Sequence, residues 1–251
     1  MWVVFSETNR GKVRPKNQDA LIRERFSLPE GEACLCAVAD GMGGHLAGDV
    51  ASRIAVEELS LGVAETIHRL PPSEVLSLAV TRANSKVLLL AQSDPSCAGM
   101  GTTLTAALLF GQVAFVCHVG DSRAYTYHGG RLTRLTDDHS YVEELLRKGE
   151  LSLDDAEKHP KRNILTRALG VQAELLMDCQ EFDLGDVEML LLCTDGLTKL
   201  LSDHEIQGII AAHPDRAEVL RALLDMALER GAPDNVTALV ISRGGGVIRG
   251  E

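Results

Sequence analysis

Residues 104–121 read LTAALLFGQVAFVCHVGD, two apolar runs of strand length joined by Gly111-Gln112. A two-residue connection that contains glycine is typical of a tight β-hairpin, so the runs 104–110 and 113–119 are predicted to pair antiparallel. Tyr127-His128-Gly129-Gly130-Arg131 predicts a second hairpin. Other apolar runs of strand length lie at Ala33–Ala39, Val187–Cys193 and Val236–Ile241. Most of these strands follow one another without an intervening helix, which favours antiparallel sheets.

Helical patterns occupy a few separate blocks of the chain. Apolar residues recur at helical spacing over 46–60 and 73–92, and a third block runs from 215 to 230 and stops at Gly231. Ser202-Asp203-His204-Glu205 has the pattern of a capping box, so another helix is expected to begin there. Each helix has one apolar stripe and should lie against a sheet, which predicts a layered sandwich.

The length of 251 residues fits one domain, which we place at residues 1–243. Residues 137–163 are polar and charged, with one short helical patch, and we expect them to form a small flap. Residues 244–251 are expected to be a short flexible tail.

The composition indicates which kinds of binding partner and which cellular location to expect. The 25 basic and 36 acidic residues give a formal charge of −11, which disfavours nucleic acid and anionic membranes as partners. No cysteines have C-x-x-C spacing, and free cysteines in apolar runs behave as small hydrophobes; these are Cys34, Cys36, Cys117 and Cys193. We recognise no signal peptide and no apolar stretch near the ~18 residues of a membrane span. We therefore expect a cytoplasmic monomer with free thiols, while a membrane-bound parent protein stays open.

Three apolar runs end in an aspartate next to a glycine, at Asp40-Gly41, Gly120-Asp121 and Asp195-Gly196. A fourth acid, Asp234, lies just before the run 236–241. In an antiparallel sheet the end of one strand lies beside the start of its neighbour, so these carboxylates are predicted to meet at one edge. Carboxylates that meet repel one another unless a cation neutralises them, and oxygen ligands favour Mg²⁺ or Mn²⁺.

Two such ions about 4 Å apart can hold a hydroxide at neutral pH and clamp a phosphoryl group for in-line attack. A simpler interpretation stays open, because any single Asp-Gly is most often a turn. Arg14, in the segment Arg14-Pro15-Lys16-Asn17-Gln18-Asp19, has the fixed fork that binds phosphate at two points. A surface arginine near a chain start is usually only solvated, so this residue alone is a weak signal.

The ordered motifs resemble those of the PPM (PP2C-type) metal-dependent protein phosphatases, especially the compact bacterial members. The matching pieces are Arg14-x-x-Asn17-Gln18-Asp19, Asp40-Gly41-Met42-Gly43-Gly44-His45, Gly101-Thr102-Thr103, Gly120-Asp121-Ser122-Arg123, Leu135-Thr136-Asp137-Asp138-His139-Ser140, Leu165-Thr166-Arg167-Ala168-Leu169-Gly170, Thr194-Asp195-Gly196 and Asp234-Asn235. The resemblance implies an α+β fold, a four-layer α-β-β-α sandwich of two antiparallel sheets flanked by helices. It also implies hydrolysis of phosphoserine and phosphothreonine with Mn²⁺ or Mg²⁺, by in-line attack of a metal-bridging hydroxide.

The resemblance assigns expected roles to the acidic residues. Asp40 would bridge two core metal ions, and Asp195 and Asp234 would complete the shell of one of them. The carbonyl of Gly41 would serve the other ion. Asp121, together with Asp195, would hold a third and weaker ion.

Three more residues receive roles by resemblance. Asp19 would hold metal-bound water, Arg14 would grip the substrate phosphate, and Asn235 would orient the acid before it. The proton donor to the leaving group stays open, because animal relatives often have a histidine where this chain has Met42, which cannot transfer a proton. His45, three residues on, either contacts the substrate or is only a helix-start histidine, and a metal-bound water is the alternative donor.

Three functions compete at this point. An active phosphatase is the first, with phosphorylated proteins and a bacterial serine/threonine kinase that it opposes as expected partners. A pseudophosphatase that binds partners without turnover is disfavoured, because Asp40, Asp195, Asp234 and Arg14 are all present. An unrelated two-metal hydrolase of small phosphoesters fits the carboxylates but not the ordered motifs.

Overall fold

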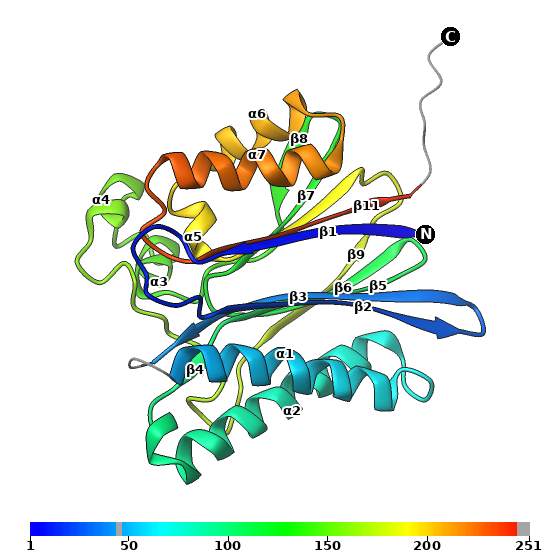
Figure 1. The fold of residues 1–251 in the computed structure, drawn as a ribbon, viewed down its shortest axis with the longest axis horizontal. Coiled ribbons are helices and arrows are strands. Elements are labelled where there is room, and N and C mark those ends of the chain that lie inside the picture. Colours follow the sequence, from blue (N-terminus) through cyan, green and yellow to red (C-terminus); the bar gives the residue numbers. More distant parts are fainter. Residues whose placement is uncertain (44–46, 245–251) are drawn as a thin grey trace.

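The computed structural model describes residues 1–43 and 47–244, whose strands form two antiparallel sheets (Figure 1). One sheet has the order β1-β11-β10-β7-β8, and the other has the order β2-β3-β5-β6-β9 with the short β4 paired to β3. The strands are β1 (Trp2–Asn9), β2 (Asp19–Leu28), β3 (Gly31–Met42), β4 (Gly101–Thr102), β5 (Leu104–Phe110), β6 (Val113–Val119), β7 (Arg123–His128), β8 (Arg131–Arg134), β9 (Asp178–Asp183), β10 (Met189–Cys193) and β11 (Val236–Arg243). The prediction of antiparallel sheets is confirmed.

Helices cover the outer face of each sheet, so the molecule has four layers (Figure 1). α1 and α2 pack on the β2–β9 sheet, and α6 and α7 pack on the β1–β8 sheet. The helices are α1 (Ala47–Thr66), α2 (Pro72–Ser93), α3 (Tyr141–Arg147), α4 (Leu153–Lys158), α5 (Asp195–Thr198), α6 (Asp203–Ala212) and α7 (Arg216–Glu229), with a 3₁₀ turn, η1 (Pro95–Cys97). The four-layer α-β-β-α sandwich that the resemblance implied is confirmed.

Within strand β3, the run Ala33–Ala39 is apolar at every position. Alternate residues of a strand point to opposite faces. Cys34, Cys36 and Val38 lie in the cluster between the two sheets, while Leu35 and Ala37 lie in the cluster under the helices. Both faces of this strand are therefore buried, and the run Ala33–Ala39 carries no polar residue.

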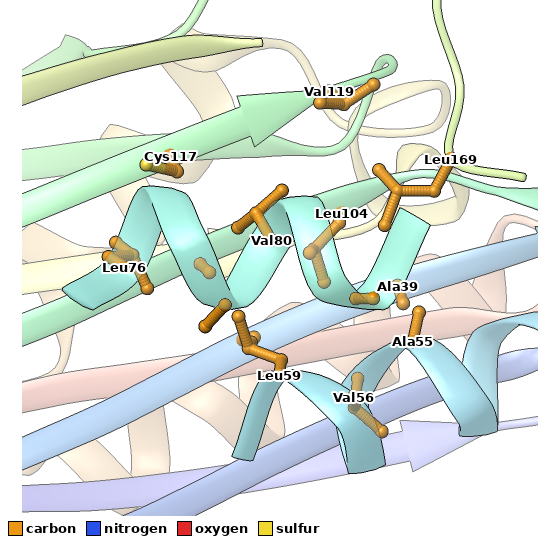
Figure 2. Packing of buried hydrophobic residues seen from close by; sticks show 14 of the residues in the cluster. Ala39, Ala55, Val56, Leu59, Leu76, Val80, Leu104, Cys117, Val119 and Leu169 are labelled. Atoms are coloured by element: carbon orange, nitrogen blue, oxygen red, sulfur yellow. The ribbon is translucent and has the colours of Figure 1, made fainter. Parts of the chain in front are cut away.

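The helix side of this sheet is a packed apolar layer (Figure 2). Leu59 of α1 and Leu76 and Val80 of α2 belong to the same buried cluster as Ala39 and Leu104 of the sheet, and all five are at most 1% exposed. Burying one such leucine contributes about 1.5 to 3 kcal/mol of apolar transfer free energy. This layer covers one face of the sheet.

Both predicted hairpins are present with the expected turns. β5 and β6 pair from Leu104 opposite Val119 to Phe110 opposite Val113, so two residues form the turn. β7 and β8 are joined by Gly129 and Gly130, with φ of 55° and 81°. Positive φ at both turn positions is the type I′ geometry, which glycine adopts without steric cost.

The predicted helices are also confirmed, although α1 continues to Thr66, past the predicted end at 60, and residue 46 lies outside the described residues. The capping box is formed by Ser202 and Glu205 at the start of α6, and Asp215 caps α7. β1, β2 and β9 were not predicted from the sequence. These three strands lie at sheet edges and alternate or mix exposed polar residues with apolar ones, which weakens their signal.

The expectation of free thiols is wrong at one position. Cys117 on β6 lies directly opposite Cys179 on β9, and the two form a disulfide with a Cα–Cα distance of 4.2 Å. The pairing depends on the register of β9, a strand that the sequence did not predict. The remaining four cysteines are free and buried; they are Cys34, Cys36, Cys97 and Cys193.

Residues 137–163 contain the two short helices α3 and α4, each capped by a serine side chain at Ser140 and Ser152. Of the tail that was predicted to be flexible, Gly244 is described and donates its N–H to the carbonyl of Met1, while 245–251 lie outside the described residues. Over the part of the chain that the structure describes, no helix combines the length and apolar character that a bilayer crossing requires.

Candidate metal centre

Five aspartates lie where strands of the two sheets begin or end. Asp19 is the first residue of β2 and pairs in register with Asp40 on β3. Asp121 follows β6 of the same sheet. Asp195 follows β10 and Asp234 precedes β11, which are neighbours in the other sheet. Strand polarity therefore supplies acids from both sheets to the same edge of the sandwich.

A pocket of about 440 Å³ opens at this edge. It is lined by Arg14, Gln18, Asp40, Gly41, Met42, Gly43, Thr103, Asp121, Asn163, Leu165, Thr166, Arg167, Ala168, Val171, Asp195, Lys199, Asp234 and Asn235. Seven of the nine residues singled out from the sequence thus share one pocket. Asp19 is not among the lining residues, and His45 lies outside the described residues, so the role of His45 stays a prediction.

The backbone of Asp40 is fixed by two threonines. Its N–H donates to Oγ1 of Thr103 at 2.9 Å, and its carbonyl accepts from Oγ1 of Thr102 at 3.0 Å. The carbonyl also accepts from the N–H of Thr103 at 2.9 Å. Both threonines are buried, so the motif Gly101-Thr102-Thr103 holds the acid in place. This role of the two threonines was not predicted from the sequence.

Asp19 ties one sheet to the other. Its Oδ2 accepts hydrogen bonds from Oγ1 of Thr194 at 2.8 Å and of Thr237 at 2.6 Å. Thr194 directly precedes α5 and Thr237 lies on β11, so both donors come from the opposite sheet. Oδ1 of Asp19 is buried and has no hydrogen-bond partner. One oxygen of this carboxylate is therefore held rigidly, and the other is available to a ligand.

Asn235 anchors the N-terminal segment. Its Oδ1 accepts from the N–H of Gln18 at 2.8 Å, and its Nδ2 donates to the carbonyls of Arg10 at 2.8 Å and Lys16 at 3.0 Å. The contact with Asp234 Oδ1, at 2.9 Å, is made by the backbone N–H of Asn235 and not by its side chain. The side chain that was expected to orient Asp234 positions the segment that carries Arg14.

Gly41 sits at a point of close backbone approach. A Cβ at this position would lie 1.9 Å from the carbonyl oxygen of Gly48, near the start of α1. No side chain can be accommodated there without moving the helix or the strand. The glycine after Asp40 is thus required by packing, and its role as a carbonyl ligand stays a prediction.

The buried acids repel one another. The pKa of Asp40 is well above its usual value, because the carboxyl is buried and because four other aspartates, Asp195 foremost, lie near it. Burial and Asp195 likewise raise the pKa of Asp121 to about 8. Burial raises the pKa of Asp19 to about 7, although the hydroxyls of Thr237 and Thr194 oppose this effect. Such a cluster is stable in its ionised form only when cations lie among its members.

Two side-chain cations already contact the cluster. Arg14 donates to Oδ2 of Asp234 at 2.8 Å, and Lys199 pairs with Oδ2 of Asp195. In residues 1–43 and 47–244, no three acidic, histidine or cysteine side chains converge on one ligand position. This fits the two ion pairs, which turn the carboxylates of Asp234 and Asp195 toward their own cations.

The donor set nevertheless fits divalent cations that prefer oxygen. Oδ1 of Asp195 and Oδ1 of Asp19 are buried without a partner, and a buried carboxylate oxygen is costly unless something binds it. All the acids involved are carboxylates, the ligand type of Mg²⁺ and Mn²⁺. Met42 also lines the pocket and has no proton to give.

Comparisons with known proteins agree with this geometry. The family model described as protein phosphatase 2C matches residues 11–238. The serine/threonine phosphatase stp of Listeria welshimeri is 39% identical over 241 residues, which is 94% of each chain. The crystal structure of Stp1 from Staphylococcus aureus is similar with a TM-score of 0.88 and 31% identity, over 98% of this chain and 96% of that one. The catalytic domain of PstP, solved in complex with two manganese ions, is similar with a TM-score of 0.81 and 34% identity, over 96% of this chain and 97% of that one.

Proposed function

This chain belongs to the protein phosphatase 2C family, and we propose that it hydrolyses phosphoserine and phosphothreonine in proteins with the help of divalent cations. The observation that carries the proposal is the convergence of Asp40, Asp121, Asp195 and Asp234 with Arg14 in one pocket. The pocket combines acids that can bind cations with a guanidinium that can bind phosphate. A pseudophosphatase, which does not turn over substrate, would not need all of these residues.

Three carboxylates are the proposed ligands of two core ions. Asp40, whose pKa is raised by the charges of the four other aspartates, is the proposed bridging ligand, and Asp195 and Asp234 would complete the shell of one ion. The Gly41 carbonyl would serve the second ion. Bound Mn²⁺ or Mg²⁺ supplies an activated water at neutral pH and neutralises charge on the phosphoryl group. PstP, solved with two manganese ions, supports this number of core ions.

Arg14 is the proposed phosphate-binding residue. Its side chain is 49% exposed at the pocket and reaches Asp234, so the guanidinium stands where a substrate enters. The planar fork can hold two phosphate oxygens at once, which orients the phosphoryl group for in-line attack. The Asn235 hydrogen bonds to the segment 10–18 fix the position from which Arg14 acts.

Asp19 is proposed to orient the attacking water. Its Oδ2 is locked by Thr194 and Thr237, so the free Oδ1 has a fixed direction. The leaving alkoxide takes its proton from water or from His45, because Met42 has none to give. These assignments keep every proton transfer on a group that can carry it.

The wider assignments are proposals of the same kind. Residues 1–243 form the catalytic domain, and residues 137–163 form a flap beside the pocket, since Asn163 lines it. The expected partners are phosphorylated proteins and a serine/threonine kinase whose action the protein reverses. We expect a monomer in the cytoplasm. The Cys117–Cys179 disulfide counts against that location, because disulfides are uncommon in reducing compartments.

Substrate class can be tested with matched phosphopeptides. The same peptide carrying phosphoserine, phosphothreonine or phosphotyrosine is incubated with the protein and Mn²⁺, and free phosphate is measured. We expect turnover of the first two peptides and much slower turnover of the third. Turnover of small phosphoesters without any turnover of phosphoserine peptides would favour the small-molecule hydrolase instead.

A further inference from the structure

Lys199 follows α5, one helical turn after Asp195, and its ammonium contacts Oδ2 of that carboxylate. The acid comes first in this i,i+4 pair, which is the favourable order on a helix. The side chain of Asp195 is 10% exposed and that of Lys199 is 43% exposed. The two oxygens of Asp195 therefore differ, because Oδ2 has a resident cation and Oδ1 is buried without a partner.

Lys199 also faces Asp121. Both residues line the metal pocket, and both line a second cavity of about 370 Å³ whose wall includes residues of α3. Asp195 and Asn163 are the other residues common to the two cavities. The positive charge of Lys199 acts favourably on Asp121 as well as on Asp195. The ammonium thus stands in the wall between the cavities, beside the two acids that a third ion would need.

The charge balance of the cluster also disfavours a third divalent ion. The five acids carry five negative charges when ionised, and Arg14 and Lys199 carry two positive ones. Two divalent ions would leave this group with one net positive charge, and a third would leave it with three. Like charges in a partly buried site oppose one another strongly, so the third ion is disfavoured while Lys199 stays in place.

Building on the phosphatase function proposed above, we propose that Lys199 is a built-in cation that occupies the place of a third divalent ion between Asp121 and Asp195. The chain then holds two divalent ions, and the weaker third ion that the family resemblance implied at Asp121 is absent. Because a lysine side chain cannot dissociate, this part of the site is filled at every metal concentration. Lys199 is in this account a positioning residue that holds Oδ2 of Asp195 and leaves Oδ1 to a core ion.

The proposal is tested by counting bound metal and not only by activity. Equilibrium dialysis against Mn²⁺, followed by elemental analysis, is applied to the wild type, Lys199→Arg and Lys199→Asp. We expect about two ions per chain in the wild type and in Lys199→Arg, and about three in Lys199→Asp, where the new carboxylate joins Asp121 and Asp195. The matched control is Arg53→Met, which breaks an exposed i,i+4 pair with Glu57 and should leave the count unchanged.

Thermal unfolding in chelator is a second and independent measurement. Lys199→Met removes the charge at similar size, so a buried acid loses its partner, and Tm should fall by roughly 2 to 4 °C. Lys199→Arg should keep the wild-type Tm. A wild type with about three ions, a Lys199→Asp count equal to the wild type, or a Lys199→Met Tm equal to the wild type in chelator would each overturn the proposal.

The two proposals fail in different ways. A wild type that turns over phosphoserine peptides while binding about three ions overturns the role of Lys199 and leaves the phosphatase function standing. A wild type that binds about two ions but releases no phosphate overturns the function and supports the role of Lys199.

Discussion

Replacing Asn235 with alanine should weaken both the fold and substrate binding. The side chain is 4% exposed and makes three hydrogen bonds, at 2.8, 2.8 and 3.0 Å, to the segment that carries Arg14. One such bond contributes about 1 kcal/mol net, so the loss should be about 3 kcal/mol in the free energy of unfolding. For a chain of this length that loss corresponds to roughly 6 to 12 °C in Tm.

The assay combines urea unfolding with steady-state kinetics on a phosphoserine peptide. Because the segment loses its anchor, Arg14 is less well placed, and KM should rise more than kcat falls. Val219→Ala, a buried substitution on α7 away from the pocket-lining residues, should lower stability without raising KM. A stability loss below about 1 kcal/mol, or a KM equal to that of the wild type, would refute the reasoning.

Three further predictions concern phosphate binding, the disulfide and pH. Arg14→Ala should raise KM for phosphopeptides with a smaller change in kcat, whereas the exposed Lys12→Ala in the same segment should not; equal kinetics for the two variants would remove Arg14 from the phosphate site. Reduction of the Cys117–Cys179 disulfide, which joins residues 62 positions apart, should lower the free energy of unfolding by about 4 kcal/mol, because the unfolded chain regains the entropy of the open loop. A Cys117→Ser/Cys179→Ser double variant should lose about as much stability, and added reductant should not change its stability further. In chelator, the free energy of unfolding measured with urea should fall by about 1 kcal/mol as pH rises from about 7 to about 8.5. The reason is that Asp121 has a pKa of about 8 in the folded protein and loses its proton in this range, whereas the unfolded carboxyl has already lost its proton. Saturating Mn²⁺ should abolish this slope, because the positive charge of two core ions beside Asp121 lowers the pKa of its carboxyl, and an unchanged slope would contradict the cation site.

The parts of the fold that were predictable are those whose signal is local. The run 104–119 specifies a hairpin through two buried strands and a glycine turn, and the observed register agrees with it. β1, β2 and β9 were not predicted, because an edge strand exposes polar residues and is defined mainly by its neighbour. The Cys117–Cys179 bond depends on that same long-range register, so the apolar run around Cys117 led to the wrong expectation of a free thiol.

The residues of the candidate site likewise differ in whether a local sequence signal identifies them. The aspartates could be identified because each stands where an apolar run begins or ends, and strand polarity brings such positions together. The residues that hold them in place come from distant segments, as Thr237 does for Asp19 and Thr103 does for Asp40. The contact between Lys199 and Asp195 could have been predicted from the sequence, because Lys199 stands four residues after Asp195, which is the spacing of a helical ion pair.

Metal-dependent turnover by the aspartate cluster is the claim on which the account depends most. The measurement is phosphate release from a phosphoserine peptide by the metal-free protein, as Mn²⁺ is added back and then removed with chelator. We predict no turnover without the metal, full recovery on its addition, and near-complete loss at every Mn²⁺ concentration in Asp195→Ala. Turnover that persists in chelator, or an Asp195→Ala variant with wild-type rates, would contradict the account.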